Sequence, residues 1–126
     1  MKSRLSLRMI VTVLGVGAAL ALPRFGFAAE ESAGGQSQTL TGEVVDLMCY
    51  LDHGARGEKH KGCAETCIKN GGPVGLLSGD QLYLVVGDHK PMNKELAAYA
   101  AQTITLKGKV VEKNGMKLIE NAQVVK

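Results

Sequence analysis

The sequence predicts a mainly β domain: a five-stranded barrel of the OB type with a Cys/His-bearing helical insertion after strand 1 and a short helix between strands 3 and 4. Three observations support this fold class. The predicted elements run in the order strand, elaborated connection, strand, strand, short helix, strand, strand. The folded part has the length of one domain with a modest core. Gly42 and Gly108 interrupt the first and fourth strands, where closure of a small barrel requires bends.

The N-terminus has the layout of a secretory signal peptide, which we predict to span residues 1–28. A basic segment, MKSRLSLR, precedes an uncharged apolar run of fourteen residues, and small residues surround a predicted cleavage after Ala28. This run is shorter than the about twenty residues of a membrane-spanning helix. An uncleaved membrane anchor is the alternative, which Arg24 disfavours because it interrupts any extension of the run. We therefore expect a periplasmic or secreted protein that does not contact the membrane after signal cleavage.

The charge balance changes once the signal is removed. The chain has 15 basic and 12 acidic residues, and four of the basic ones lie within residues 1–28. The mature chain of about 98 residues is therefore close to neutral and has no basic patch with interleaved aromatic residues. We expect no nucleic-acid partner. Residues 29–38 are polar and rich in glycine and serine, which predicts a flexible lead-in, and residues 39–126 form the single OB-like domain.

The five strands are predicted from alternating or short apolar runs bounded by turn residues. A Ser-Gly-Asp turn joins the second strand to the third, and Asn114-Gly115 is a type I′ hairpin signal between the fourth and the fifth. The predicted strands are residues 39–47, 73–77, 81–86, 103–111 and 117–125.

Two helical segments are predicted between these strands. Residues 61–69 can form a helix that ends at Asn70-Gly71-Gly72-Pro73, where glycine terminates the helix and proline cannot continue it. Residues 93–101 predict a short helix with Asn93 as its N-cap.

Residues 49–67 hold all three cysteines and two of the three histidines of the chain. His60, Cys63 and Cys67 have the spacing i, i+3, i+7, which places them on one stripe of an α-helix. Cys49, at the end of the first strand, could close over that stripe. Three thiolates and one imidazole form a tetrahedral zinc site, and two thiolates with one imidazole suit Cu(I). His53 is a second candidate ligand, and Gly62 disfavours a helix that includes His60.

Two other interpretations of these cysteines remain open. Exported proteins often oxidise their cysteines, so Cys49 could pair with Cys63 or Cys67 and staple the helix to the first strand. This leaves one thiol unpaired. A reactive Cys63 thiol is the third interpretation, with Lys59, His60 and Lys61 as the cations that could lower its pKa. The sequence offers no convincing enzyme active site.

Asp46 and Asp52 flank the cysteine-rich stretch. Solvated loop carboxylates are the favoured interpretation, and a hydrogen bond to a metal-binding histidine is the alternative.

With these residues identified, the mature chain resembles a group of small exported bacterial domains of uncharacterised function. The resemblance covers most of the folded part, and its most specific element is the Cys…His…Cys-x3-Cys arrangement. It implies an OB-like fold and a Cys/His site, and it supplies no activity. The shared pattern is Thr41-Gly42-Glu43-Val44-Val45-Asp46 before Cys49, then His60, Cys63-Ala-Glu-Thr-Cys67, the Gly71-Gly72-Pro73-Val74 break, the Tyr83 strand, and Ile104 to Val110 with Lys107-Gly108-Lys109.

We therefore predict an exported protein that holds copper or zinc through Cys49, His60, Cys63 and Cys67, with His53 as a further candidate. Its role would lie in metal handling or redox-protein maturation, with a metalloprotein or redox protein as partner. The alternative is a disulfide-stapled OB-like binding module, without metal, for a protein or small-ligand partner.

Overall fold

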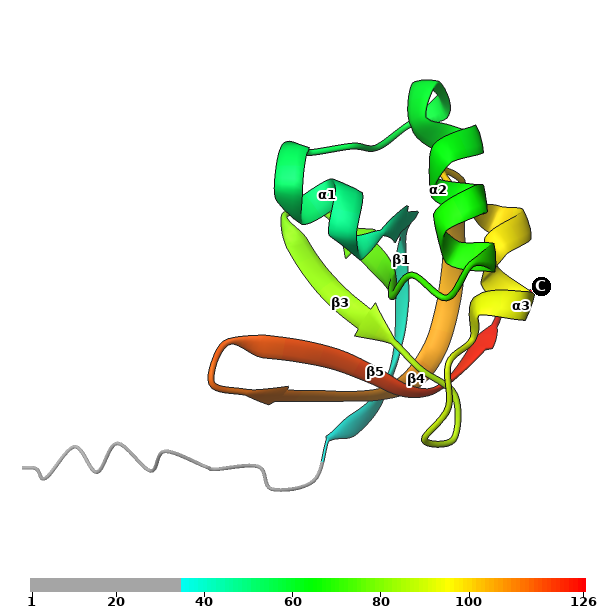
Figure 1. Cartoon of the computed structure of the whole chain (residues 1–126). Coiled ribbons are helices and arrows are strands. Elements are labelled where there is room, and N and C mark those ends of the chain that lie inside the picture. The colour runs from blue at the N-terminus through cyan, green and yellow to red at the C-terminus, as the bar shows by residue number, and fades with distance from the viewer. Residues whose placement is uncertain (1–34) are drawn as a thin grey trace, which may run out of the picture. The chain divides into compact units, whose positions relative to one another are not determined.

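The computed structural model describes residues 35–126, so the predicted signal peptide and most of the predicted lead-in lie outside the described residues. The strands close into one barrel in the order β1-β2-β3-β5-β4. Neighbouring strands are antiparallel except for the parallel pair β3 and β5. The predicted mainly β, OB-like barrel is confirmed (Figure 1). Its strands are β1 (Gln36–Asp46), β2 (Val74–Ser78), β3 (Gln81–Val85), β4 (Thr103–Lys113) and β5 (Met116–Val124).

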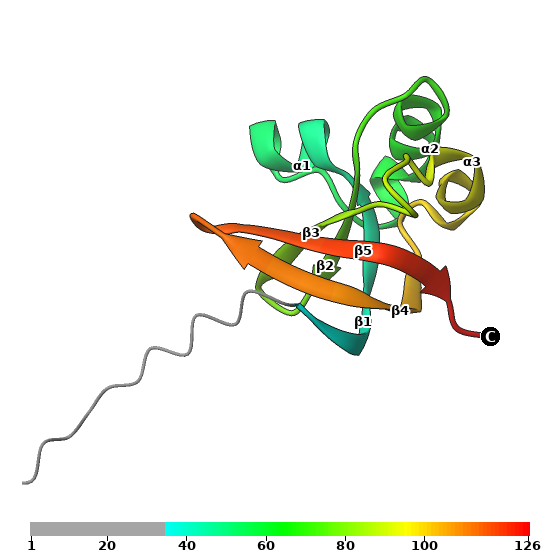
Figure 2. The ribbon, with the colours of Figure 1, turned by 90° about the horizontal axis from the view of Figure 1, so that it is seen from below.

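The helical segments lie between β1 and β2 and between β3 and β4. Figure 2 shows α2 and α3 side by side at one end of the barrel, with α1 apart from them at the same end. None of the helices within residues 35–126 has the length and apolar character to cross a membrane. The segments are α1 (Leu47–His53), the 3-10 turn η1 (Glu58–His60), α2 (Lys61–Lys69), α3 (Asn93–Leu96) and the 3-10 turn η2 (Ala97–Tyr99).

The barrel core consists of alternate strand residues together with one face of the helices. Ile68 of α2 and Leu96 of α3 are completely buried with the strand residues, so both helices close the end of the barrel. Burial of each such side chain contributes about 1.5–3 kcal/mol. The buried members are Val44, Ala64, Ile68, Val74, Leu76, Val85, Met92, Leu96, Ala97, Ala100, Leu106, Ile119 and Ala122.

The two glycines expected at bends are required by close packing between strands. A Cβ at Gly42 would collide with the carbonyl oxygen of Leu77 on β2. A Cβ at Gly108 would lie 2.6 Å from Ile119 Cγ2, and the β4–β5 register shifts at this position, which is a bulge. Both glycines therefore let neighbouring strands approach closely where the sheet curves.

The first strand begins earlier than predicted. Residues 36–38 were expected to belong to the flexible lead-in, but they pair with residues 108–110 of β4. A polar sequence can form a strand here because the backbone ladder with β4 provides its hydrogen bonds, whatever the side chains are. Strand β1 therefore begins three residues earlier than the alternating pattern indicates.

The prediction of Asn93 as a helix N-cap is wrong. Met92 occupies the N-cap position of α3, and no side chain caps it. The Asn93 amide instead donates hydrogen bonds of 2.7 Å to the carbonyl oxygens of Ile68 and Gly72. The predicted helix 93–101 is also shorter, since it continues as η2 and ends at Tyr99.

The predicted turns are confirmed. Asn114 and Gly115 both have positive φ, 53° and 81°, as a type I′ hairpin requires. Gly79, in the turn between β2 and β3, has φ 57°. The two hairpins therefore have the registers that their turn residues predict.

Candidate metal centre

The first wall of the candidate site is α1, which the sequence analysis did not predict. Asp46 is its N-cap, and the Oδ1 atom accepts a hydrogen bond of 2.9 Å from the backbone N–H of Cys49. Gly54, with φ 70°, ends the helix and donates its N–H to the carbonyl oxygens of Cys49 and Tyr50. Both signals are present in the sequence. The helix fixes Cys49 one turn beyond the end of β1.

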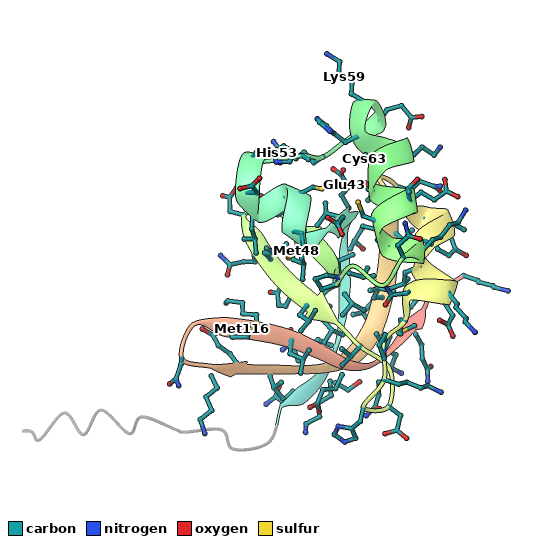
Figure 3. The ribbon with its side chains drawn as sticks, in the orientation of Figure 1. Glu43, Met48, His53, Lys59, Cys63 and Met116 are labelled. Atoms are coloured by element: carbon teal, nitrogen blue, oxygen red, sulfur yellow. The ribbon has the colours of Figure 1, made fainter. Side chains whose placement is uncertain are left out.

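A short crossing segment, residues 54–57, connects α1 to the second wall (Figure 3). The side-chain carboxylate of Glu43 on β1 accepts a hydrogen bond from the N–H of Gly57, and Ala55 is buried. Gly57 has φ 74°, a conformation that favours glycine. The segment is thereby fixed to the barrel, and it directs the chain into η1 and α2.

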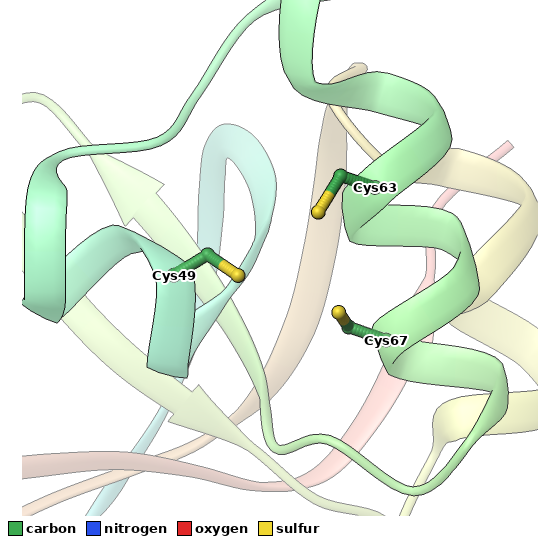
Figure 4. A group of neighbouring side chains, drawn as sticks. All are labelled: Cys49, Cys63 and Cys67. Atoms are coloured by element: carbon green, nitrogen blue, oxygen red, sulfur yellow. The ribbon is translucent and has the colours of Figure 1, made fainter.

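The second wall is α2, which occupies residues 61–69 as predicted. Ile68 and Ala64 bury one face of this helix against the barrel core. Cys63 and Cys67, one turn apart, project from the face that is turned toward α1 (Figure 4). The helix ends at the predicted stop, where the N–H of Gly72 donates to the carbonyl oxygen of Cys67 at 2.9 Å.

The sulfur atoms of Cys49, Cys63 and Cys67 all lie within 4.8 Å of one another. Figure 4 shows the Cys49 sulfur facing the other two across the space between α1 and α2. All three are free thiols here, Cys63 exposed and the other two half-buried. The expected meeting of Cys49 with the Cys63–Cys67 stripe is therefore confirmed.

The histidines occupy a different position from the thiols. Among the residues that the structure describes, the one group of three or more potential ligand atoms within 4.8 Å of one another consists of the three cysteines. His60 lies in η1 and α2 begins one residue later, so His60 does not continue the helical stripe. Its ring centroid is 6.3 Å from that of His53, and His53 Nδ1 lies 3.3 Å from the Asp52 carboxylate. A ligand role for His53 or His60 stays a prediction.

Asp46 has a different environment from the one that the sequence favours. A solvated loop carboxylate is the favoured interpretation, but Asp46 is 1% exposed and is the one buried charged side chain of residues 35–126. Its Oδ2 atom is buried without a hydrogen-bond partner among the described residues. A Cβ at Gly72 would lie 2.6 Å from this oxygen, so glycine leaves the space that the carboxylate fills. Asp52 is solvated, as expected.

The environment of Cys49 and Cys67 raises the pKa of both thiols. A side-chain interaction with Asp46, followed by burial and the negative charge of Asp46, raises the pKa of Cys49 to about 12. Burial, together with the neighbouring Cys63 thiol, raises the pKa of Cys67. A nucleophilic cysteine needs the opposite shift, because the thiolate is the reactive form. Cys49 and Cys67 are therefore poor nucleophiles in this environment.

The arrangement fits a thiophilic metal ion. Zinc–sulfur bonds are about 2.3 Å long, so two sulfurs that bind one ion lie at most about 4.6 Å apart. The separations of the three sulfur atoms, none above 4.8 Å, are of this order. A bound cation would also compensate the negative charges of three thiolates and of the neighbouring Asp46 carboxylate. Cys49, Cys63 and Cys67 can therefore supply three ligands to one ion.

Comparisons of the chain with protein-family models, with curated proteins and with solved structures found no match.

Proposed function

We propose that this is an exported protein that holds one transition metal ion, copper or zinc, and that acts in metal handling or redox-protein maturation. The single observation that carries the proposal is the convergence of three sulfur atoms, from two separate helices, within 4.8 Å. Every cysteine of the chain takes part in it. Thiolates are soft ligands, which select copper(I) and zinc over magnesium, calcium or manganese.

The three cysteines would contribute to the binding of the ion from two different helices. Cys63 and Cys67 stand on a helix that the core fixes, while Cys49 closes over them from α1. Cys63 is exposed, which leaves the site open to solvent and to a partner that delivers or removes the ion. His53 is the last residue of α1 and His60 lies in η1, and we propose both as further ligands. Binding would displace protons from the thiols.

A second candidate function would follow from oxidation of the cysteines. Cys49 faces two thiols from another helix, so a disulfide to Cys63 or to Cys67 would staple α1 to α2 and leave one thiol free. Such a bond would remove two of the three sulfur ligands, because thiolates rather than disulfides bind metals. The oxidised form would then be a stapled OB-like module that binds a protein or small-ligand partner.

Metal titration of the reduced, mature chain tests the proposal. We expect one Zn²⁺ or Cu(I) ion per chain, with affinity lowered at least about a hundredfold in Cys63→Ser. Thr66→Ser is a matched control on the same exposed side of α2, and it keeps the hydroxyl that donates to the Gly62 carbonyl. An equal affinity in Cys63→Ser and the parent protein would refute the ligand assignment. His60→Ala tests the additional ligand in the same titration.

A further inference from the structure

A buried carboxylate, that of Asp46, lies beside the sulfur cluster. The helix cap accounts for only one of its two oxygen atoms. Asp46 Oδ1 caps α1 by accepting from the N–H of Cys49. Its Oδ2 atom is buried and has no partner among the residues described. A buried carboxylate with an unsatisfied oxygen is costly, and serine or asparagine would cap the helix equally well without the charge. The cap role therefore explains one oxygen and leaves the charge unexplained.

The carboxylate lies beside the two half-buried cysteines. Asp46 Oδ1 accepts from the N–H of Cys49, and a Cβ at Gly72 would lie 2.6 Å from Asp46 Oδ2 and 2.9 Å from the carbonyl oxygen of Cys67. Gly72 lies on the other side of Oδ2 and provides the space it needs. Since Asp46 is buried and Cys63 is exposed, the carboxylate lies on the interior side of the cluster and solvent on the other.

We propose that Asp46 sets the charge preference of the metal centre, so that it favours a divalent cation of the zinc class over a monovalent one such as Cu(I). The inference rests on the proposed function of the three cysteines. Three thiolates and one carboxylate carry four negative charges, and a dication compensates twice as much of this charge as a monocation. The attraction between the ion and Asp46 scales with the charge of the ion and is strong where water is excluded. Thiolates alone do not make this distinction, since they bind both ions.

Asp46→Asn isolates the charge from the helix cap. Asparagine is as good an N-cap as aspartate, so its Oδ1 can still accept from the N–H of Cys49. The amide has nearly the same size and fits the space beside Gly72. Asp46→Ala removes both the cap and the charge and is the matched control for a purely structural role. Asp46 is a positioning residue in this proposal, because it acts on the ion through its field.

The experiment measures the Zn²⁺ and Cu(I) dissociation constants of the full reduced chain by competition with a chromophoric chelator. In Asp46→Asn we expect the Zn²⁺ affinity to fall about tenfold or more, while the Cu(I) affinity stays within about threefold or rises. The ratio of the two affinities therefore shifts by at least about tenfold. Asp46→Ala should add an equal loss for both ions, since a disturbed α1 moves Cys49 irrespective of the metal.

Two results would overturn the proposal. An equal fall for both ions in Asp46→Asn would reduce Asp46 to a structural role, and an unchanged Zn²⁺ affinity would remove it from the site. Both leave the proposed function intact, because the parent protein still binds metal through its cysteines. Failure of the proposed function has a different signature: the parent binds neither ion, or binds equally well in Cys63→Ser.

Discussion

The two helices that carry the cysteines are attached to the barrel in different ways. Helix α2 buries Ala64 and Ile68 in the core, and the Asn93 amide donates to the carbonyl oxygens of Ile68 in its last turn and of Gly72 just after it. Helix α1 buries only Leu47, while Met48 and Leu51 are 64% and 71% exposed. Hydrogen bonds at its two ends, from the Asp46 cap and from the N–H of Gly54, hold the helix in place.

This difference assigns different roles to the three proposed ligands. Cys63 and Cys67 form a fixed pair, because their helix belongs to the hydrophobic core. Cys49 depends on the Asp46 cap and on the anchoring of residues 54–57, so it is the ligand whose position a bound ion would stabilise most. The site joins a firmly packed helix to a lightly packed one.

The strongest test of this comparison removes one apolar side chain from each helix. Ile68→Ala should lower the free energy of unfolding by about 3 kcal/mol, because Ile68 is completely buried. Leu51→Ala on α1 should change it by less than about 0.5 kcal/mol, because the side chain is exposed. Urea denaturation of the two variants gives both numbers. Comparable losses would mean that α1 is as firmly packed as α2.

The space around Asp46 gives a second test. In Gly72→Ala the new methyl group would lie 2.6 Å from Asp46 Oδ2 and 2.9 Å from the Cys67 carbonyl oxygen, which should cost about 1–3 kcal/mol. Gly62→Ala is the control, since a Cβ on this α2 residue meets nothing within 4 Å, and it should be neutral or stabilising. Thermal unfolding measures both.

Combination of Gly72→Ala with Asp46→Ser extends this test. Serine keeps the cap and is shorter than aspartate, so the double variant should be more stable than the sum of the two single effects. Additive effects would show that the methyl group and the carboxylate do not compete for the same space.

The anchor of the crossing segment should have a smaller effect. Glu43→Ala removes the acceptor for the Gly57 N–H and should cost about 1 kcal/mol, with faster hydrogen exchange confined to residues 54–57. Glu43→Gln keeps an acceptor oxygen and is the matched control. A uniform increase of exchange across α2 would contradict a local role.

The titration of Cys49 should change the stability of the fold only at alkaline pH. Its pKa is raised from 9.0 to about 12 in the folded protein, so the folded state holds the proton more tightly than the unfolded state. The resulting stability is fully present below pH 9 and is lost as the pH rises toward 12. The melting temperature of the reduced, metal-free protein should fall across this window, and by less in Cys49→Ser. An equal fall in both proteins would exclude Cys49 as the cause.

The barrel was predictable from local signals, and the site only partly. Alternating residues and the Asn114-Gly115 turn define strands without knowledge of the tertiary structure. Helix α1 escaped prediction because its seven residues leave Met48 and Leu51 facing solvent, so they present no apolar stripe.

The site itself depended on packing between distant segments. The spacing of Cys63 and Cys67 predicted their common face, and the end of β1 predicted the approach of Cys49. The burial of Asp46 could not be predicted, because it requires the glycine at position 72, which is distant in sequence. His60 stayed apart because α2 begins after it.

The central claim is that one metal ion lies between α1 and α2, bound by three cysteines. Its most direct test is the native and denatured intact mass of the mature protein, purified without added metal or reductant. The account predicts a native mass with one additional copper or zinc ion and a denatured chain with three free thiols. A chain without metal that is about 2 Da lighter than the fully reduced form would contain a disulfide and would contradict it.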